Sequence, residues 1–328
     1  MSHTVRTVQV KRDLAFAVVA GAALLVSCGS STTVPAGSTF PTTADLRAVW
    51  GSGPDDVWSV GSGGTIVHFD GRTWTLRASG TTENLTGISG SSPADVWVTG
   101  DKGTILHWNG KSWSKAWTTP DTELLAVWAN TPTDAWAVGI DWAGGLGGSS
   151  GYVVHWNGSS WQDADALASS SLWSVWASGP DDVWMVGDRP QDDGLVLRGA
   201  GTSANPFDAS IYTGPELRGI WGASATDVWV SPYQRAVQHW DGSTWTTRPG
   251  SSMPTGAQIF GIGGTAPNDA WAVGTDGVAF HYDGDAWSTV PTGTTNPLAA
   301  VWADSPDDVW AVGSGGTVLR WDGSAWRH

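Results

Sequence analysis

The sequence predicts an all-β fold, a seven-bladed β-propeller of four-stranded antiparallel blades, from residue 46 to residue 328. Three observations predict it. A motif recurs seven times at intervals of 39 to 48 residues, turn residues separate short alternating segments within each copy, and tryptophan marks fixed positions. Repeats of about 40–45 residues that hold four short strands are typical of propeller blades. We expect blades at about 46–84, 85–123, 124–171, 172–216, 217–258, 259–297 and 298–328.

The first copy shows the four strands expected in every blade. They lie around 46–50, 57–61 and 66–69, and an outer strand opens at Trp74 after the turn Asp70-Gly71. Asp-Gly is a strong signal for a tight hairpin. The third position of the first strand is small in every copy, which fits innermost strands that crowd around a channel. These residues are Ala48, Gly87, Ala126, Ser174, Gly219, Gly261 and Ala300.

One tryptophan follows Asp and Val or Ala in the second strand of each copy. A blade buries its faces against its neighbours, and a tryptophan removes about 150–250 Å² from water, so we interpret this column as packing between blades. Trp117, Trp142 and Trp173 fall outside every tryptophan column. The second-strand column is Trp58, Trp97, Trp136, Trp184, Trp229, Trp271 and Trp310.

Two polar columns accompany the tryptophans. The aspartate that enters the second strand is interpreted as structural, a residue that binds local backbone N–H groups. A calcium cage needs several converging oxygen ligands, so we expect no metal and no cofactor. The third-strand histidines, with Arg198 and Arg320 in two blades, are expected to form hydrogen bonds within their own blades. The columns are Asp56, Asp95, Asp134, Asp182, Asp227, Asp269 and Asp308, and His68, His107, His155, His239 and His281.

The N-terminal segment predicts export. Residues 1–27 carry a basic start and an apolar run at 14–26 that is too short to span a bilayer, which is typical of a signal peptide. The run ends in Leu25-Val26-Ser27-Cys28-Gly29, which resembles the bacterial lipoprotein box. The resemblance implies a lipid on Cys28 and an anchored protein of the outer membrane or cell surface. Residues 28–45 are rich in Ser, Thr, Gly and Pro and are expected to form a flexible tether.

Charge narrows the class of partner. The formal net charge is −15, from 16 Lys and Arg against 31 Asp and Glu. Phosphate binding needs clustered basic residues, so the composition excludes nucleic acid as a partner. We expect a glycan or an envelope protein as ligand, a membrane contact only through Cys28, and a monomer.

The repeat resembles known propeller families. The unit Asp308-Val-Trp-Ala-Val-Gly313, followed by Arg320-Trp-Asp-Gly323 and Trp326, resembles the tectonin-type repeat. That family includes glycan-binding lectins, so the resemblance implies carbohydrate binding. The Asp-Gly-x-x-Trp hairpin is similar to the Asp-box of sialidase-type propellers but lacks the residue between Asp and Gly. WD40 repeats are similar in period, and Trp240-Asp241 is a Trp-Asp pair.

The sequence predicts a binding protein and not an enzyme. No phosphate loop or His-Cys metal spacing occurs, and the mature chain has three glutamates. Glycoside hydrolysis of the sialidase-like type remains the less favoured alternative. A lectin and a scaffold for protein–protein contacts both remain open.

Departures from the repeat are the candidate ligand-binding residues, because the fold does not need them. The loops between second and third strands are unusual in the third, fourth and fifth blades, and they are expected on the face of the inter-blade connections. The alternative is that they are tolerated surface insertions. The candidates are Asp141, Trp142, Tyr152, Asp188, Arg189, Asp192, Asp193, Tyr233 and Arg235. Blade 4 also replaces its Asp-Gly hairpin with a stretch that holds Phe207 and Tyr212, and residues 36–45 are a possible extension of the last blade.

Overall fold

A computed structural model describes residues 40–142, 150–167, 170–190, 193–200, 207–209, 212, 214–233, 236–247 and 257–328. The chain divides into two units, Met1–Ser38 and Thr39–His328. The predicted signal peptide, Cys28, the tether up to residue 39, Asp192 and Arg235 all lie outside the described residues. In the described ranges, no helix is long and apolar enough to cross a membrane.

Seven antiparallel sheets follow one another along the chain, and each forms one blade, which confirms the predicted all-β seven-bladed propeller. Six sheets have four strands in sequence order, and the described residues of blade 4 form three. Blade 1 consists of β1 (Leu46–Gly53), β2 (Asp56–Gly61), β3 (Ile66–Phe69) and β4 (Trp74–Arg77). The other strands are, in blade 2, β5 (Leu85–Ser92), β6 (Asp95–Gly100), β7 (Thr104–Trp108) and β8 (Trp113–Trp117); in blade 3, β9 (Thr122–Thr131), β10 (Asp134–Asp141), β11 (Ser150–Trp156) and β12 (Trp161–Leu167); in blade 4, β13 (Ser171–Gly179), β14 (Asp182–Arg189) and β15 (Asp193–Gly199); in blade 5, β16 (Leu217–Ser224), β17 (Asp227–Pro232), β18 (Gln238–Trp240) and β19 (Trp245–Thr247); in blade 6, β20 (Ile259–Ala266), β21 (Asp269–Gly274), β22 (Ala279–Tyr282) and β23 (Trp287–Thr289); in blade 7, β24 (Leu298–Ser305), β25 (Asp308–Gly313), β26 (Thr317–Trp321) and β27 (Trp326–Arg327).

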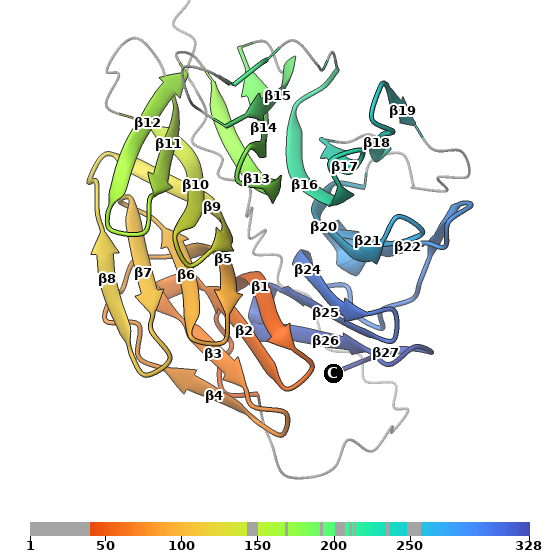
Figure 1. Ribbon diagram of the computed structural model, residues 1–328. Helices are drawn as coiled ribbons and strands as arrows, with labels where there is room; N and C mark the ends of the chain where they lie inside the picture. Colours follow the sequence, from red (N-terminus) through yellow and green to blue (C-terminus); the bar gives the residue numbers. More distant parts are fainter. Residues whose placement is uncertain are drawn as a thin grey trace, which may run out of the picture. The chain divides into compact units, whose positions relative to one another are not determined.

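The first strand of every blade lies innermost. β1, β5, β9, β13, β16, β20 and β24 each contact the innermost strands of both neighbouring blades, and β24 contacts β1 to complete the circle (Figure 1). Small third residues allow this approach. A Cβ on Gly87 would lie 2.9 Å from Cα of Ala126, and one on Gly261 would lie 2.8 Å from Cα of Ala300. The predicted reason for the small residues, crowding around the axis, is confirmed.

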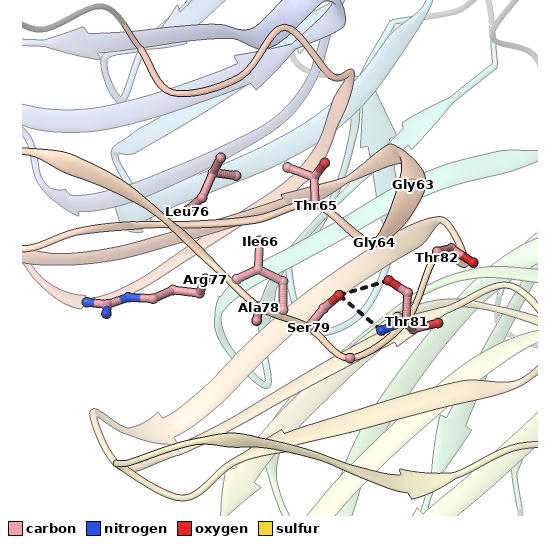
Figure 2. Close-up of a pocket in the computed structure, with 11 residues that line it drawn as sticks. Gly63, Gly64, Thr65, Ile66, Leu76, Arg77, Ala78, Ser79, Thr81 and Thr82 are labelled. Atoms are coloured by element: carbon pink, nitrogen blue, oxygen red, sulfur yellow. Dashed lines mark hydrogen bonds between the residues drawn. The ribbon is translucent and has the colours of Figure 1, made fainter.

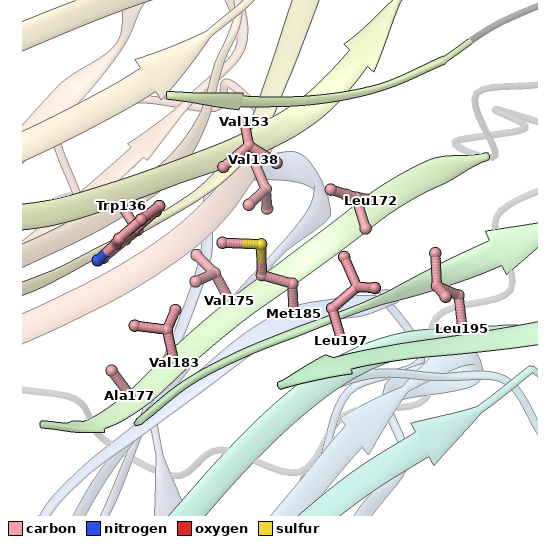
Figure 3. Packing of buried hydrophobic residues seen from close by; sticks show 10 residues of the cluster. All are labelled: Trp136, Val138, Val153, Leu172, Val175, Ala177, Val183, Met185, Leu195 and Leu197. Carbon is pink, nitrogen blue, oxygen red and sulfur yellow. The ribbon is translucent and has the colours of Figure 1, made fainter. Parts of the chain in front are cut away.

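The second-strand tryptophans fill the seams between blades. Trp58 stacks on His68 of its own blade at 3.9 Å and meets Trp108 and Trp113 of the next blade at 5.1 and 5.4 Å. The same arrangement closes the ring, where Trp310 lies 5.1 Å from Phe69 of blade 1. Each seam holds one cluster of buried apolar residues, and Figure 3 shows the cluster between blades 3 and 4. The predicted packing role of this column is therefore confirmed.

Residues 40–45 close the ring without adding a strand. Oδ1 of Asp45 accepts a hydrogen bond from the N–H of Gly315 in blade 7 at 2.8 Å. The inter-blade connection after blade 1 makes the same contact, from Gly63 to Asn84 at 3.0 Å. The segment therefore docks on blade 7 as a connection docks on its preceding blade. The possible extension of the last blade is not found in these residues, because none of them belongs to a strand.

Two aromatic residues that follow β15 of blade 4 pack against the neighbouring blades. Phe207 meets Trp136 of blade 3 at 5.6 Å, and Tyr212 meets Trp245 of blade 5 at the same distance. Asp208 forms an isolated bridge with Arg198 at the outer edge of β15. This stretch was expected to be free for function, but Phe207 and Tyr212 complete the packing of two seams.

Candidate functional site

Every innermost strand contains a β-bulge at the residue that follows its buried leucine or isoleucine. In blade 1 the pairing of β1 with β2 shifts between Leu46 and Ala48, which makes Arg47 the bulge residue, and the same shift recurs in all seven blades. A bulge bends the strand and redirects the side chain of the extra residue. The bulge residues are Arg47, Thr86, Leu125, Trp173, Arg218, Phe260 and Ala299. We call this set the mouth; its residues lie at the end of the innermost strands where the second strands finish.

The mouth lies on the face that carries the variable loops. Leu46 at the start of β1 pairs with Gly61 at the end of β2, so each loop between second and third strands emerges beside a bulge. The connections between blades also reach this face, as the hydrogen bond from the N–H of Thr119 to the carbonyl of Lys102 shows. The expectation that the two kinds of loop share a face is confirmed.

The mouth is most elaborate where blades 4 and 5 meet. Cζ of Arg218 lies 3.7 Å from the ring centroid of Trp173 and 5.3 Å from that of Tyr233. The guanidinium also pairs with Oε1 of Glu216, at 3.1 Å from Nε and 2.7 Å from Nη2. A cation within about 6 Å of a ring centroid is attracted to the ring face. One guanidinium is thus held by two rings and a carboxylate.

Further contacts orient these groups. The Nε1–H of Trp173 donates to Oδ1 of Asp188 on β14. The side-chain amide of Gln258 donates to the hydroxyl of Tyr233 at 2.8 Å, and the backbone N–H of Tyr233 donates to the carbonyl of Glu216 at 2.9 Å. Strands from blades 4 and 5 and the start of blade 6 therefore converge on one small site.

Two of the nine predicted ligand-binding residues, Asp188 and Tyr233, belong to this site. Arg189 donates instead to the carbonyl of Ala209 at 2.9 Å, and Asp193 is exposed. Asp192 and Arg235 lie outside the described residues. The site around Arg218 therefore combines residues of blades 4 and 5. The structure does not show Arg189, Asp192, Asp193 and Arg235 sharing one ligand site.

The blade 3 candidates lie elsewhere on the same face. The N–H of Trp142, which follows Asp141 at the end of β10, donates to the carbonyl of Asp121 at 2.9 Å. The hydroxyl of Tyr152 donates to Asp163. Burial and that carboxylate raise the pKa of Tyr152 to about 12, so the phenol stays protonated. Neither of these hydrogen bonds involves Arg218.

Sequence reasoning missed the central residue, Arg218, and its neighbour Gln258. Trp173 stood out only as a tryptophan outside the columns, and Glu216 only as a rare glutamate. The available signal was the second position of the innermost strand. It differs in chemistry from blade to blade, while an apolar residue precedes it and a small one follows it in every copy.

The aspartate column has a different role from the one predicted. Oδ1 of Asp56 lies 2.6 Å from Nε2 of His68 and accepts from Trp58 at 3.1 Å, and Oδ2 accepts from Ser52 at 2.5 Å. The expectation of local backbone partners was wrong here, because the side chains of the adjacent strands lie closer. Burial raises the pKa of Asp56, but hydrogen bonds from His68 and Ser52 outweigh it, and the pKa lies below its ordinary value.

The third-strand histidines form the predicted hydrogen bonds within their blades, each to the aspartate of its own second strand. Backbone N–H groups are instead bound by the aspartates of the outer hairpins, such as Asp70. Within the described ranges, no group of three or more His, Cys, Asp or Glu is arranged to hold a metal ion.

An open groove of about 680 Å³ lies on blade 1 (Figure 2). It runs between the loop at Gly63 and Gly64 and the connection that contains Ser79 and Thr81. Leu76 on its wall is 55% exposed. The groove shares no residue with the mouth.

Comparisons with known proteins agree on the fold. A scan against models of protein families finds no match for the chain, and a search of curated protein sequences finds none. Among solved structures, the chain is similar to YCF48 from Cyanidioschyzon merolae, with a TM-score of 0.65 and 19% identity over 86% of this chain and 97% of that one. It is also similar to YCF48 bound to D1 peptide (TM-score 0.64, 17% identity, 86% and 94% covered). A third similar structure is the WD40 β-propeller domain of Doa1 (0.64, 12%, 84% and 92%).

At these identities the likeness shows the fold alone. It places the chain among β-propellers, a fold that the WD40 domain of Doa1 also has. The tectonin-type and Asp-box resemblances remain predictions.

Proposed function

We propose that this chain is a non-catalytic binding protein that holds a polypeptide segment at the mouth. The observation that carries the proposal is the contrast within β1 and its six equivalents. The residue before the bulge is always a buried leucine or isoleucine and the residue after it is always small, whereas the bulge residues range from alanine to tryptophan and arginine. At seven positions with the same backbone geometry the side chain varies without a change of fold, which suits a role in recognition.

The chemistry of the mouth suits a polypeptide. Its residues include guanidinium groups, aromatic and aliphatic side chains and a hydroxyl, which together can contact backbone carbonyls and apolar side chains. Aromatic residues and arginine are enriched in the energetically important parts of protein interfaces. The similar YCF48 structure is bound to a D1 peptide, which supports polypeptide binding as a use of this fold.

Carbohydrate recognition is the second candidate. Trp173, Tyr233 and Phe260 place three rings on the mouth face, and sugars stack on such rings. Arg218 already covers one face of Trp173, however, which leaves less open ring surface for a sugar. A scaffold that binds a folded envelope protein is the broader form of the first proposal.

A non-catalytic role is supported by the state of the carboxylates. The aspartates of the second-strand column are held by histidine or arginine, as in the pair of Asp308 and Arg320 at 2.6 Å. Such groups are engaged in the packing of their own blades. They are not paired across a cleft, as glycoside hydrolysis requires.

We also propose that the propeller is displayed on the cell envelope by a lipid on Cys28. The lipoprotein-like box and the Ser- and Thr-rich tether support this. Labelling of cells with a fatty-acid analogue tests it, with Cys28→Ala as the matched variant. Label on the wild-type chain and none on the variant is expected; equal labelling would remove the anchor from the proposal.

A peptide display library and a glycan array, both applied to the purified propeller, test the function. We expect enriched peptides whose binding falls by about tenfold or more in Phe260→Ser, since burying one aromatic ring contributes strongly to an interface. Leu76→Ser in the groove is the matched control and should bind as the wild type does. Absence of enriched peptides, or equal loss in both variants, would contradict a binding site at the mouth. Selective glycan binding that is lost in Phe260→Ser would favour the second candidate.

A further inference from the structure

Trp173, Tyr233 and Glu216 form a cage for a cation, and Arg218 occupies it. The two rings lie 3.7 and 5.3 Å from Cζ of Arg218, and Oε1 of Glu216 lies 2.7 Å from Nη2. Glu216 itself is 8% exposed. Aromatic faces together with a carboxylate are the combination that recognises guanidinium and ammonium groups. We call these three residues the cage.

The walls of the cage are held by contacts that do not involve Arg218. Trp173 is fixed by its hydrogen bond to Asp188. Tyr233 is fixed at its hydroxyl by Gln258 and at its N–H by the carbonyl of Glu216. The cage therefore keeps its form without the cation, and it is a preorganised site.

Arg218 is a replaceable occupant of this site. It is a bulge residue with no partner in the ladder between β16 and β17, and the equivalent positions of blades 2 and 7 hold Thr86 and Ala299. The fold thus has no need of arginine at this position. Without it, Glu216 would be a buried carboxylate between two ring faces, and an unpaired buried charge is strongly unfavourable. An external cation would relieve that cost.

We propose that the cage is a binding site for the guanidinium or ammonium group of a basic side chain in a polypeptide partner, which competes with Arg218 for the rings and for Glu216. The proposal rests on the proposed polypeptide-binding function. The formal net charge of −15 attracts a basic segment toward the propeller. A guanidinium fits better than an ammonium, because its plane stacks on a ring while its edge pairs with a carboxylate.

The cage itself is tested with a small cation, independently of any partner. Arg218→Ala is titrated with millimolar guanidinium chloride, with urea as the neutral group of the same shape and NaCl at equal ionic strength. The Tm of the variant should rise by about 3 °C at a tenfold excess over Kd. The wild type should not respond, because its own guanidinium fills the cage. Arg218→Gln keeps much of the stem and gives the same readout should the alanine variant fail to fold.

A second variant locates the response. Arg218→Ala combined with Glu216→Gln removes the carboxylate and should abolish the effect of guanidinium. An equal rise with urea or NaCl, or an unchanged response in the double variant, would overturn the cage.

The partner chemistry is tested with two peptides that differ in one charge. Acetyl-Gly-Arg-Gly amide is compared with its citrulline analogue, which keeps the shape and loses the cation. The arginine peptide should bind Arg218→Ala about tenfold more tightly than the citrulline peptide does. It should bind the wild type more weakly than the variant, since Arg218 competes.

These outcomes separate the two proposals. Guanidinium binding by Arg218→Ala, with no peptide enriched from the library by the wild type, would remove the proposed polypeptide-binding function and leave the cage. Enriched peptides without a preference for basic residues, and equal binding of the two tripeptides, would remove the cage as their site.

Discussion

The backbone N–H of Gly315 donates a hydrogen bond to Oδ1 of Asp45, which lies 270 residues earlier in the chain. This contact joins the last blade to the segment that leads into the first. The equivalent contact between blades 1 and 2, where the chain is continuous, is the hydrogen bond from the N–H of Gly63 to Oδ1 of Asn84. A polar contact therefore adds to the apolar packing that closes the ring between blades 7 and 1.

Replacing Asp45 by alanine should loosen the seam between blades 7 and 1. An intramolecular hydrogen bond contributes about 1 kcal/mol, and because this one is exposed we take that value as an upper limit. We expect a loss of up to that size in the free energy of unfolding by urea, with faster amide exchange in β1 and β24. Asp45→Asn is the matched control, because Asn84 makes the same contact with an amide. Equal loss in both variants would show that charge and not the hydrogen bond matters here.

Truncation of a second-strand tryptophan should be among the most damaging changes in the chain. Trp229 is 0% exposed and lies 4.8 Å from Tyr282 and 5.5 Å from Trp287 of the next blade. Trp229→Ala should cost about 3–5 kcal/mol. Urea unfolding measures it, and Leu76→Ala on the exposed wall of the groove should stay within about 0.5 kcal/mol of the wild type.

Acid should destabilise the propeller through the aspartate column. Hydrogen bonds from His107 and Ser91 outweigh the burial of Asp95, and its pKa in the folded state lies below the ordinary 3.8. The unfolded chain therefore binds the proton more readily. The stability that Asp95 provides is complete above its unfolded pKa and is lost as the pH falls through the folded one.

We expect the free energy of unfolding of the wild type to fall steeply below about pH 4. Asp95→Asn should be less stable at pH 7 and should lose less on acidification. A urea series from pH 3 to pH 7 measures both. Identical slopes for the two proteins would mean that Asp95 takes no part in acid unfolding.

Two loop residues at equivalent positions, Lys102 and Asp276, have a backbone conformation that suits glycine. Lys102 has φ of 54°, at the position that Gly63 and Gly315 occupy in blades 1 and 7. Lys102→Gly should stabilise the protein by up to about 1 kcal/mol, reduced by loss of the exposed pair with Glu83. Lys102→Ala loses the pair and keeps the strain, so the difference between the two variants isolates the backbone term.

The reverse change completes this test. A Cβ on Gly315 would meet only Asn296 Nδ2, at 3.7 Å, so Gly315→Ala adds little steric clash. Its φ of 66° still disfavours a side chain, and we expect a loss of about 1 kcal/mol. Thermal unfolding of the three variants side by side gives the order, and a stable Gly315→Ala would contradict the role of φ.

The fold was predictable because its determinants recur in the sequence. The Asp-Val-Trp column fixed the number of blades, and Trp58 packs the seam as its size suggested. The partner of Asp56 was also within reach, since an interval of 12 residues separates it from His68 and recurs in three other blades. Local turn chemistry was given too much weight at that position.

The site was less predictable because it arises between repeats. A bulge leaves no mark on an alternating pattern, so the redirection of Arg218 was hidden. The contact of Arg218 with Trp173 joins two neighbouring blades. It depends on the side chain of one bulge residue reaching the bulge residue of the preceding blade. Phe207 shows the opposite error, since an irregular stretch of sequence proved to supply a regular packing role.

Because residues 40–45 dock on blade 7 without adding a strand, the order of the blades along the chain can be changed. The strands of each blade are consecutive, and among the described residues the segment before β1 adds no strand to blade 7. The chain is therefore suited to circular permutation. A chain whose His328 is linked to Phe40, and which is opened instead between residues 78 and 83, would keep all seven seams while presenting its ends beside a different blade.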